Sequence, residues 1–274
     1  MKITMKKLAL ALAVAALPFA ASAHKGWLEP SKTVLSVGQW ITVDAATSTD
    51  PFLKDHNAMR LDNLVITAPD GSKVQPENAS TGKLRSSFDV QLNQAGTYKV
   101  AIVNSGVSAR WEEKGQRKSY PPRGQAFTAE GFAKEVPANA EKLAVTESLT
   151  QLVTFATAGK PNDTALKPTG VGLELVPLQS ITDLYVGEEA KFQFLLDGKP
   201  AADVEVEIIA DGVRYRSSVD ALELKTDKDG KFAIDWKTPG LYWMSASVSD
   251  EKATTAPAKQ RRTAYTAVVE VLSP

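Results

Sequence analysis

The fold is decided by the run AKFQFLLDGKP, residues 190–200. Apolar side chains at Ala190, Phe192 and Phe194 alternate with polar ones, which is the period of a β-strand with one buried face. Asp197-Gly198 follows the strand, and this dipeptide favours a tight turn. The run therefore predicts a strand that turns into another strand, over residues 204–208.

Short segments of the same kind, separated by turns, occur along most of the chain. In the second half they lie at residues 172–176, 222–226, 231–236, 241–248 and 264–272, and in the first half at 40–45, 64–67, 88–92, 98–103 and 152–155. We interpret residues 128–146 as an irregular insertion with at most a short helix. This spacing of strands predicts an all-β protein of two immunoglobulin-like or transthyretin-like β-sandwich domains.

The boundary between the two predicted domains lies at residues 159–170. This stretch is rich in Pro, Gly and polar residues, a composition typical of linkers. We therefore predict an N-terminal sandwich over residues 24–158 and a C-terminal sandwich over residues 171–274.

The first 23 residues have the pattern of a secretory signal peptide. A basic start is followed by the apolar run Leu8 to Leu17 and by Ala21-Ser22-Ala23, a small-x-small cleavage site. We expect cleavage after Ala23 and a periplasmic mature chain. No later stretch approaches the ~20 apolar residues that a membrane span requires, so the mature chain is not expected to cross a membrane.

Composition argues against several other functions. Residues 24–274 hold 29 Lys and Arg against 32 Asp and Glu, so no basic field indicates nucleic-acid binding. The chain has no Cys, which excludes disulfides and thiol catalysis. No motif supports a Ser-His-Asp triad. On these grounds we do not expect an enzyme.

His24 would become the first residue of the mature protein. Its free α-amine and its imidazole Nδ1 can then close a chelate ring on one metal ion, and imidazole suits copper, nickel and zinc. A metal readily displaces the proton of an amine whose pKa is roughly 8. His24 is therefore the first candidate ligand.

His56 is the only other histidine, and it lies in a predicted loop near the start of the first domain. Together the two residues would supply three nitrogens, an arrangement called a histidine brace, which fits Cu(II) or Ni(II). A carboxylate could complete the coordination shell. Asp55 and Asp50 are the nearest candidates in sequence, and Asp44 is a third. Met59 is either a soft ligand for Cu(I) or a core residue.

The segment HKGWLEP, residues 24–30, resembles the mature start, His-x-x-Trp-Leu-x-Pro, of the periplasmic nickel-uptake-associated family. The likeness continues at GQWITV, residues 38–43, and in the second half at residues 173–177, 195–200, 226–230 and 239–243. Those second-half segments are generic to carboxypeptidase-regulatory-like sandwiches. The resemblance implies a periplasmic accessory that handles nickel or cobalt, with His24 at the family's mature terminus. We do not match His56 to a family motif, so its assignment as a ligand depends only on its residue type and position in the sequence.

Three functions follow as hypotheses. The first is a periplasmic binding protein for nickel or cobalt, with copper as a further choice of metal, which serves an envelope metal-uptake transporter. The second is a copper-dependent enzyme like the polysaccharide monooxygenases, which also pair a β-sandwich with an N-terminal histidine. The third is a metal-free envelope or adhesion module.

Overall fold

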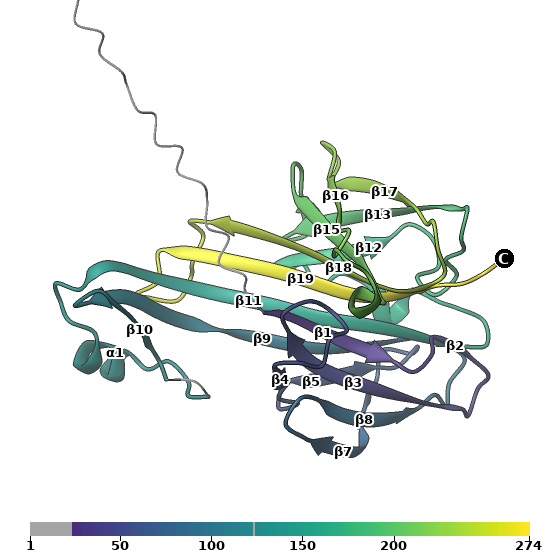
Figure 1. Ribbon diagram of the computed structural model, residues 1–274, viewed down its shortest axis with the longest axis horizontal. Coiled ribbons are helices and arrows are strands. Elements are labelled where there is room, and N and C mark those ends of the chain that lie inside the picture. The colour runs from purple at the N-terminus through teal and green to yellow at the C-terminus, as the bar shows by residue number, and fades with distance from the viewer. Residues whose placement is uncertain (1–23, 123) are drawn as a thin grey trace, which may run out of the picture.

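The computed structural model describes residues 24–122 and 124–274, and these form an all-β protein of three sheets (Figure 1). The predicted signal peptide, residues 1–23, lies outside the described residues. One helix of ordinary α type and two short 3₁₀ helices interrupt the strands; they are α1 (Ala129–Glu135), η1 (Thr164–Leu166) and η2 (Val213–Tyr215). Within the described part of the chain, no helix has the length and apolar character needed to cross a membrane.

A ten-stranded sheet runs through the middle of the molecule. Its eight-strand path is, in spatial order, β16 (Leu222–Lys225), β15 (Glu205–Ala210), β18 (Gly240–Asp250), β19 (Gln260–Val271), β11 (Glu141–Ala158), β9 (Gly96–Glu113), β5 (Leu64–Thr67) and β6 (Lys73–Val74). Two more strands pair beside this path, β10 (Gln116–Tyr120) with β9 and β2 (Val34–Leu35) with β11. Residues from both predicted domains therefore share one sheet.

A second sheet packs on the first-half strands of the central sheet. It contains β1 (Lys25–Pro30), β3 (Trp40–Ser48), β8 (Ser86–Gln91) and β7 (Glu77–Thr81), with β4 (Asn57–Ala58) paired to β3. Alternate side chains of β3, among them Ile41 and Val43, are buried, whereas Trp40 and Thr42 are exposed. This alternation is the one-sided burial that the sequence pattern predicts.

A third sheet packs on the second-half strands. It contains β12 (Leu173–Pro177), β13 (Glu189–Leu196), β14 (Lys199–Pro200) and β17 (Lys231–Asp235). Phe192 and Phe194 of β13 are fully buried and stack on Phe232 of β17, with ring centroids 5.4 and 5.5 Å from it. The predicted turn at Asp197-Gly198 forms, and Leu195 pairs with Pro200 of β14 across it. The strand expected over residues 204–208 forms as β15, but it pairs with β16 and β18 in the central sheet and not with β13.

β11 shows how the two sandwiches are joined. Leu152 and Ala156 belong to the core beneath the second sheet, whereas Val153 and Phe155 belong to the core beneath the third. Because successive side chains of a strand point to opposite faces, the two smaller sheets cover opposite faces of the central sheet, as Figure 1 also shows. The all-β, two-sandwich prediction is confirmed, and the structure adds the shared sheet.

The predicted linker, residues 159–170, runs from β11 through η1 towards β12. It is packed along its course. Leu166 and Ala165 are buried, and the Asn162 side chain accepts a hydrogen bond from the Thr97 amide and donates one to the Pro69 carbonyl. The division of the chain at this segment remains a prediction, but the segment itself is fixed to both halves.

The turn at Asp227–Gly230 links strands of two different sheets. A turn does form, with the Gly230 amide bonded to the Asp227 carbonyl, but the strands on either side do not form a hairpin. β16 pairs with β15 in the central sheet, whereas β17 pairs with β13 in the third sheet. The chain therefore crosses between the two sheets here, and Phe232 of β17 then joins the buried aromatic stack.

The segment interpreted as an irregular insertion contains more order than expected. β9 and β11 are both 18 residues long and extend beyond the sandwiches, where β10 and α1 lie beside them (Figure 1). A separate apolar cluster that includes Trp111, Tyr120 and Val136 holds this extension together. The short helix is present as expected, and Thr128 caps it by accepting a hydrogen bond from the Gly131 amide.

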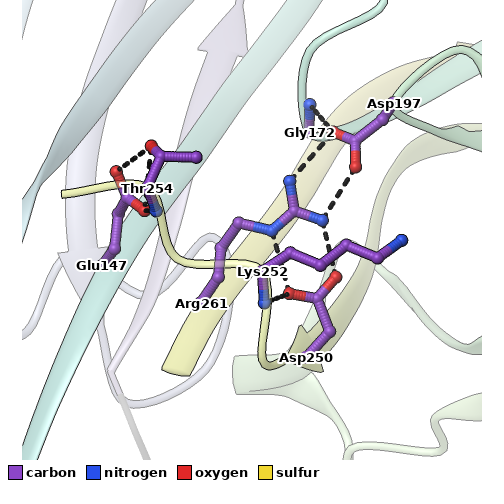
Figure 2. Close-up of polar contacts among 7 residues, drawn as sticks. All are labelled: Glu147, Gly172, Asp197, Asp250, Lys252, Thr254 and Arg261. Carbon is purple, nitrogen blue, oxygen red and sulfur yellow. Dashed lines mark hydrogen bonds and ion pairs between the residues drawn. The ribbon is translucent and has the colours of Figure 1, made fainter. Parts of the chain in front are cut away.

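Arg261 joins the third sheet to the central one, and we call Arg261, Asp197 and Asp250 the Arg261 clamp (Figure 2). Its guanidinium donates to both oxygens of Asp197, at 3.0 and 2.8 Å, and to both oxygens of Asp250, at 3.0 and 2.6 Å. The Gly172 amide adds a further hydrogen bond to Asp197. Beside the clamp, Glu147 accepts hydrogen bonds from Thr254.

Candidate metal site

The first strand carries His24 to the end of β3. β1 pairs antiparallel with β3, with Lys25 opposite Ser48, so His24 lies just beyond the last residue pair. Trp27 anchors this strand: its side chain is fully buried, and its Nε1 donates to Ser48 Oγ at 2.8 Å. The Ser48 hydroxyl in turn donates to the Asp50 carbonyl. The buried side chain of Trp27 therefore fixes the position of His24, three residues before it.

His56 reaches the same end of β3 from the other side. The chain leaves β3 at Ser48, forms a loop and returns as β4, in which Asn57 pairs with Thr47. Two contacts close the loop: the Leu53 amide donates to the Asp50 carbonyl at 3.3 Å, and the Thr49 amide donates to Asp55 Oδ1 at 3.1 Å. His56 is the last residue before β4, so the register of β4 fixes it near His24.

The two imidazole rings stack on each other. Their centroids lie 3.5 Å apart, and the ring planes differ by 9°. Both residues are exposed, and neither imidazole forms a hydrogen bond with another described residue. The only two histidines of the chain, 32 positions apart, thus meet face to face at the surface.

Two of the three candidate carboxylates, those of Asp44 and Asp55, have other partners. Asp44 lies 3.6 Å from the Lys54 ammonium and 3.3 Å from the Arg85 guanidinium. Asp55 is exposed and accepts the Thr49 amide, and the backbone carbonyl of Asp50 accepts from Ser48. Within residues 24–122 and 124–274, no group of three or more His, Asp or Glu side chains is arranged to hold a metal ion. A carboxylate ligand from Asp55 or Asp50 therefore stays a prediction.

A cleft of about 1050 Å³ begins beside His24. Its floor is the part of the central sheet that the second sheet leaves uncovered, and small side chains such as Ser245, Ser247 and Ala264 line it. His24, Lys25 and Gly26 form one wall. The residues at the start of β1 thus also form the rim of the cleft.

Contacts across the cleft fix β1 to the second half of the chain. Lys25 Nζ lies 2.6 Å from Glu207 Oε1 and 5.1 Å from the centre of the Trp243 ring. Trp243 Nε1 donates to the Gly26 carbonyl at 3.0 Å. The contact between Lys25 and Glu207 had no signal in the sequence, because the two residues are 182 positions apart and Lys25 stands at a variable position of the HKGWLEP segment.

The fold and the exposed histidine pair define an all-β, two-sandwich protein with a candidate nitrogen-donor site at the start of its first strand. Residues 21–250 match the family model described as Domain of unknown function (DUF4198). The chain belongs to this DUF4198 family. No curated protein matches the sequence significantly.

Several solved structures are similar at low identity. The D0-D1 domain of intimin is 15% identical, covers 89% of this chain and 97% of its own, and has a TM-score of 0.22. An I-band fragment of titin is 9% identical over 91% and 66%, with a TM-score of 0.20. The Escherichia coli adhesin FdeC is 12% identical over 90% and 64%, with a TM-score of 0.22. At these values the similarities carry no argument about function.

Proposed function

We propose that this DUF4198 protein binds a divalent transition metal in the periplasm, nickel or cobalt with copper as a further choice, and serves metal uptake or handling. The observation that carries the proposal is the contact between its only two histidines, His24 and His56, whose ring centroids are 3.5 Å apart. Two exposed imidazoles that have no hydrogen bond to a described residue are a donor set suited to copper, nickel and zinc.

The third donor would be the α-amine of His24. No third His, Asp or Glu side chain joins the pair among the described residues, and two ligands alone hold a divalent ion weakly. Cleavage after Ala23 would release an amine on the residue that already carries one imidazole. Metal binding would then require removal of the signal peptide, so only the exported protein would have the complete site.

The stacked rings must separate to share one ion. A metal bound to an imidazole lies in the plane of that ring, on the lone pair of one nitrogen. Two parallel rings face to face do not direct their lone pairs at one point, so at least one side chain has to turn. Both side chains are exposed, and turning either of them breaks no hydrogen bond within the described residues.

The test uses the mature chain starting at His24, made by cleaving a fusion directly before that residue. Isothermal titration with Ni(II), Co(II) and Cu(II) should give one site per chain. His24→Ala, His56→Ala and a ten-residue Gly/Ser extension before His24 should each weaken binding at least a hundredfold, about 2.7 kcal/mol. Asp55→Asn and Asp50→Asn test the predicted carboxylates separately.

The outcome against the proposal is equal affinity in the mature chain, in His24→Ala and in the extended chain. Affinity alone does not identify the natural metal, because copper outcompetes nickel and cobalt at most nitrogen sites. The metal should therefore be read from the intact mass of the protein purified from the periplasm of expressing cells, without added metal or chelator.

The cleft beside His24 favours one second candidate, a copper-dependent enzyme similar to the polysaccharide monooxygenases. A volume of about 1050 Å³ next to the histidine would give a substrate access to a bound ion. Copper-dependent peroxide formation, or cleavage of chitin or cellulose, by the mature chain would support this candidate. Tight copper binding with neither activity would count against it.

A further inference from the structure

Met59 lies beside the strand that carries His24. Its backbone is held on both sides, because its amide donates to the Ala45 carbonyl at 3.3 Å and its carbonyl accepts from Ser86 Oγ at 2.5 Å. Its side chain is half-buried and packs at the edge of the core beneath the second sheet. The tip of the side chain points at Gly26, since a Cβ placed on Gly26 would lie only 2.9 Å from Met59 Cε.

Gly26 is two residues from His24, and two steps along extended backbone span about 7 Å. Met59 and His24 also line the same cleft. The thioether of Met59 is therefore held within side-chain reach of the proposed metal site, and the absence of a side chain on Gly26 is what leaves room for it.

We propose that Met59 supplies a thioether ligand to the metal held by His24 and His56, and that this ligand makes the site retain copper as Cu(I). The inference rests on the proposed function. Thioether sulfur is a soft donor that favours Cu(I), whereas Ni(II) and Co(II) at nitrogen sites gain little from it. The unbranched, flexible Met side chain can move its sulfur by turning its outer torsions without shifting the backbone.

Sulfur is scarce in this chain, which sharpens the assignment. It has no Cys and four Met, of which only Met59 and Met244 lie in residues 24–274. Met244 is 1% exposed in the core of the other sandwich. Any sulfur bound to copper in the folded mature chain would therefore come from Met59, and Met244 offers a matched control.

The experiment compares Cu(I) and Cu(II) affinities of the mature chain, with Cu(I) kept reduced under anaerobic conditions and measured by competition with a chromophoric chelator. Met59→Leu, which nearly conserves volume, should lower Cu(I) affinity at least tenfold and change Cu(II) and Ni(II) affinity less than threefold. Met244→Leu should change none of them. X-ray absorption of the Cu(I) form should detect a sulfur neighbour that Met59→Leu removes.

Unchanged Cu(I) affinity in a folded Met59→Leu variant, or a copper shell without sulfur in the unmodified protein, would overturn the role of Met59 and leave the histidine site intact. If His24→Ala and His56→Ala keep full Cu(II) and Ni(II) affinity, the proposed function itself fails. Gly26→Ala gives a second variant, since its new Cβ would displace the Met59 tip. It should lower Cu(I) affinity in the same direction while His24 and His56 are unchanged.

Discussion

The Arg261 clamp and the histidine pair are two polar clusters of the same molecule with opposite properties. In the clamp, one guanidinium donates to four carboxylate oxygens, and Asp197 and Asp250 each accept a backbone amide as well (Figure 2). The histidine rings contact each other and have no hydrogen bond within the described residues. The clamp, whose charged groups are all paired, joins parts of the fold, whereas the exposed imidazole nitrogens remain available to a ligand.

The largest effect on folding is expected from breaking the clamp. Arg261→Ala would leave Asp197 and Asp250 close together without a countercharge, and should lower the free energy of unfolding by about 2 kcal/mol. Urea unfolding followed by circular dichroism measures this loss. The neighbouring exposed Arg262 provides the control, since Arg262→Ala should change stability by less than about 0.5 kcal/mol. Equal losses in both variants would show that the clamp has no special role.

The clamp should also make stability depend on pH in the acid range. Hydrogen bonds from Arg261 hold the pKa values of Asp197 and Asp250 below their usual range, and the same contacts raise the pKa of Arg261. Below about pH 4 the unfolded chain takes up protons before the folded chain does. The stabilisation is thus complete above pH 4 and is lost as pH falls through the lowered pKa values.

Urea midpoints between pH 7 and pH 3 test this dependence. The unmodified chain should lose more stability below pH 4 than the Asp197→Asn, Asp250→Asn double variant, so the two curves should converge in acid. Curves that stay parallel throughout would mean that other carboxylates account for the acid effect. Glu147 is one of these, since hydrogen bonds from Thr255 and then Thr254 lower its pKa.

Local periodicity predicted most strands but not their partners. Ala190 to Phe194 alternate as a half-buried strand should, and Asp197-Gly198 forms the expected turn. The parallel pairing of β11 with β19 joins residues such as Thr154 and Val268, which are 114 positions apart. No local pattern encodes that pairing, because it depends on how the two cores cover opposite faces of one sheet. The shared sheet was therefore not predictable by these means.

The candidate site was predictable to a different extent. His24 follows from a cleavage-site pattern, and His56 follows because no other histidine exists. Their contact and the register of β4 became visible only in three dimensions. The candidate carboxylates were chosen because they are near the histidines in sequence, which does not determine where their side chains point. Asp44, for example, lies on β3 with Lys54 and Arg85 as neighbours. No local signal predicted the contacts that fix β1 to the second half, which join Lys25 to Glu207 and Trp243 to the Gly26 carbonyl.

The smallest effect on folding is expected at the histidine pair. Without metal, His24→Ala and His56→Ala should each change the free energy of unfolding by less than about 0.5 kcal/mol, because both rings are exposed and neither has a hydrogen bond within the described residues. With Cu(II) or Ni(II) at a hundred times the Kd, the unmodified mature chain should gain about 2.7 kcal/mol, and the variants should gain almost none. Urea unfolding with and without metal measures both quantities. A metal-free loss above about 1 kcal/mol in His56→Ala would mean that the stacked rings hold the loop to β1, and the contrast with the Arg261 clamp would disappear.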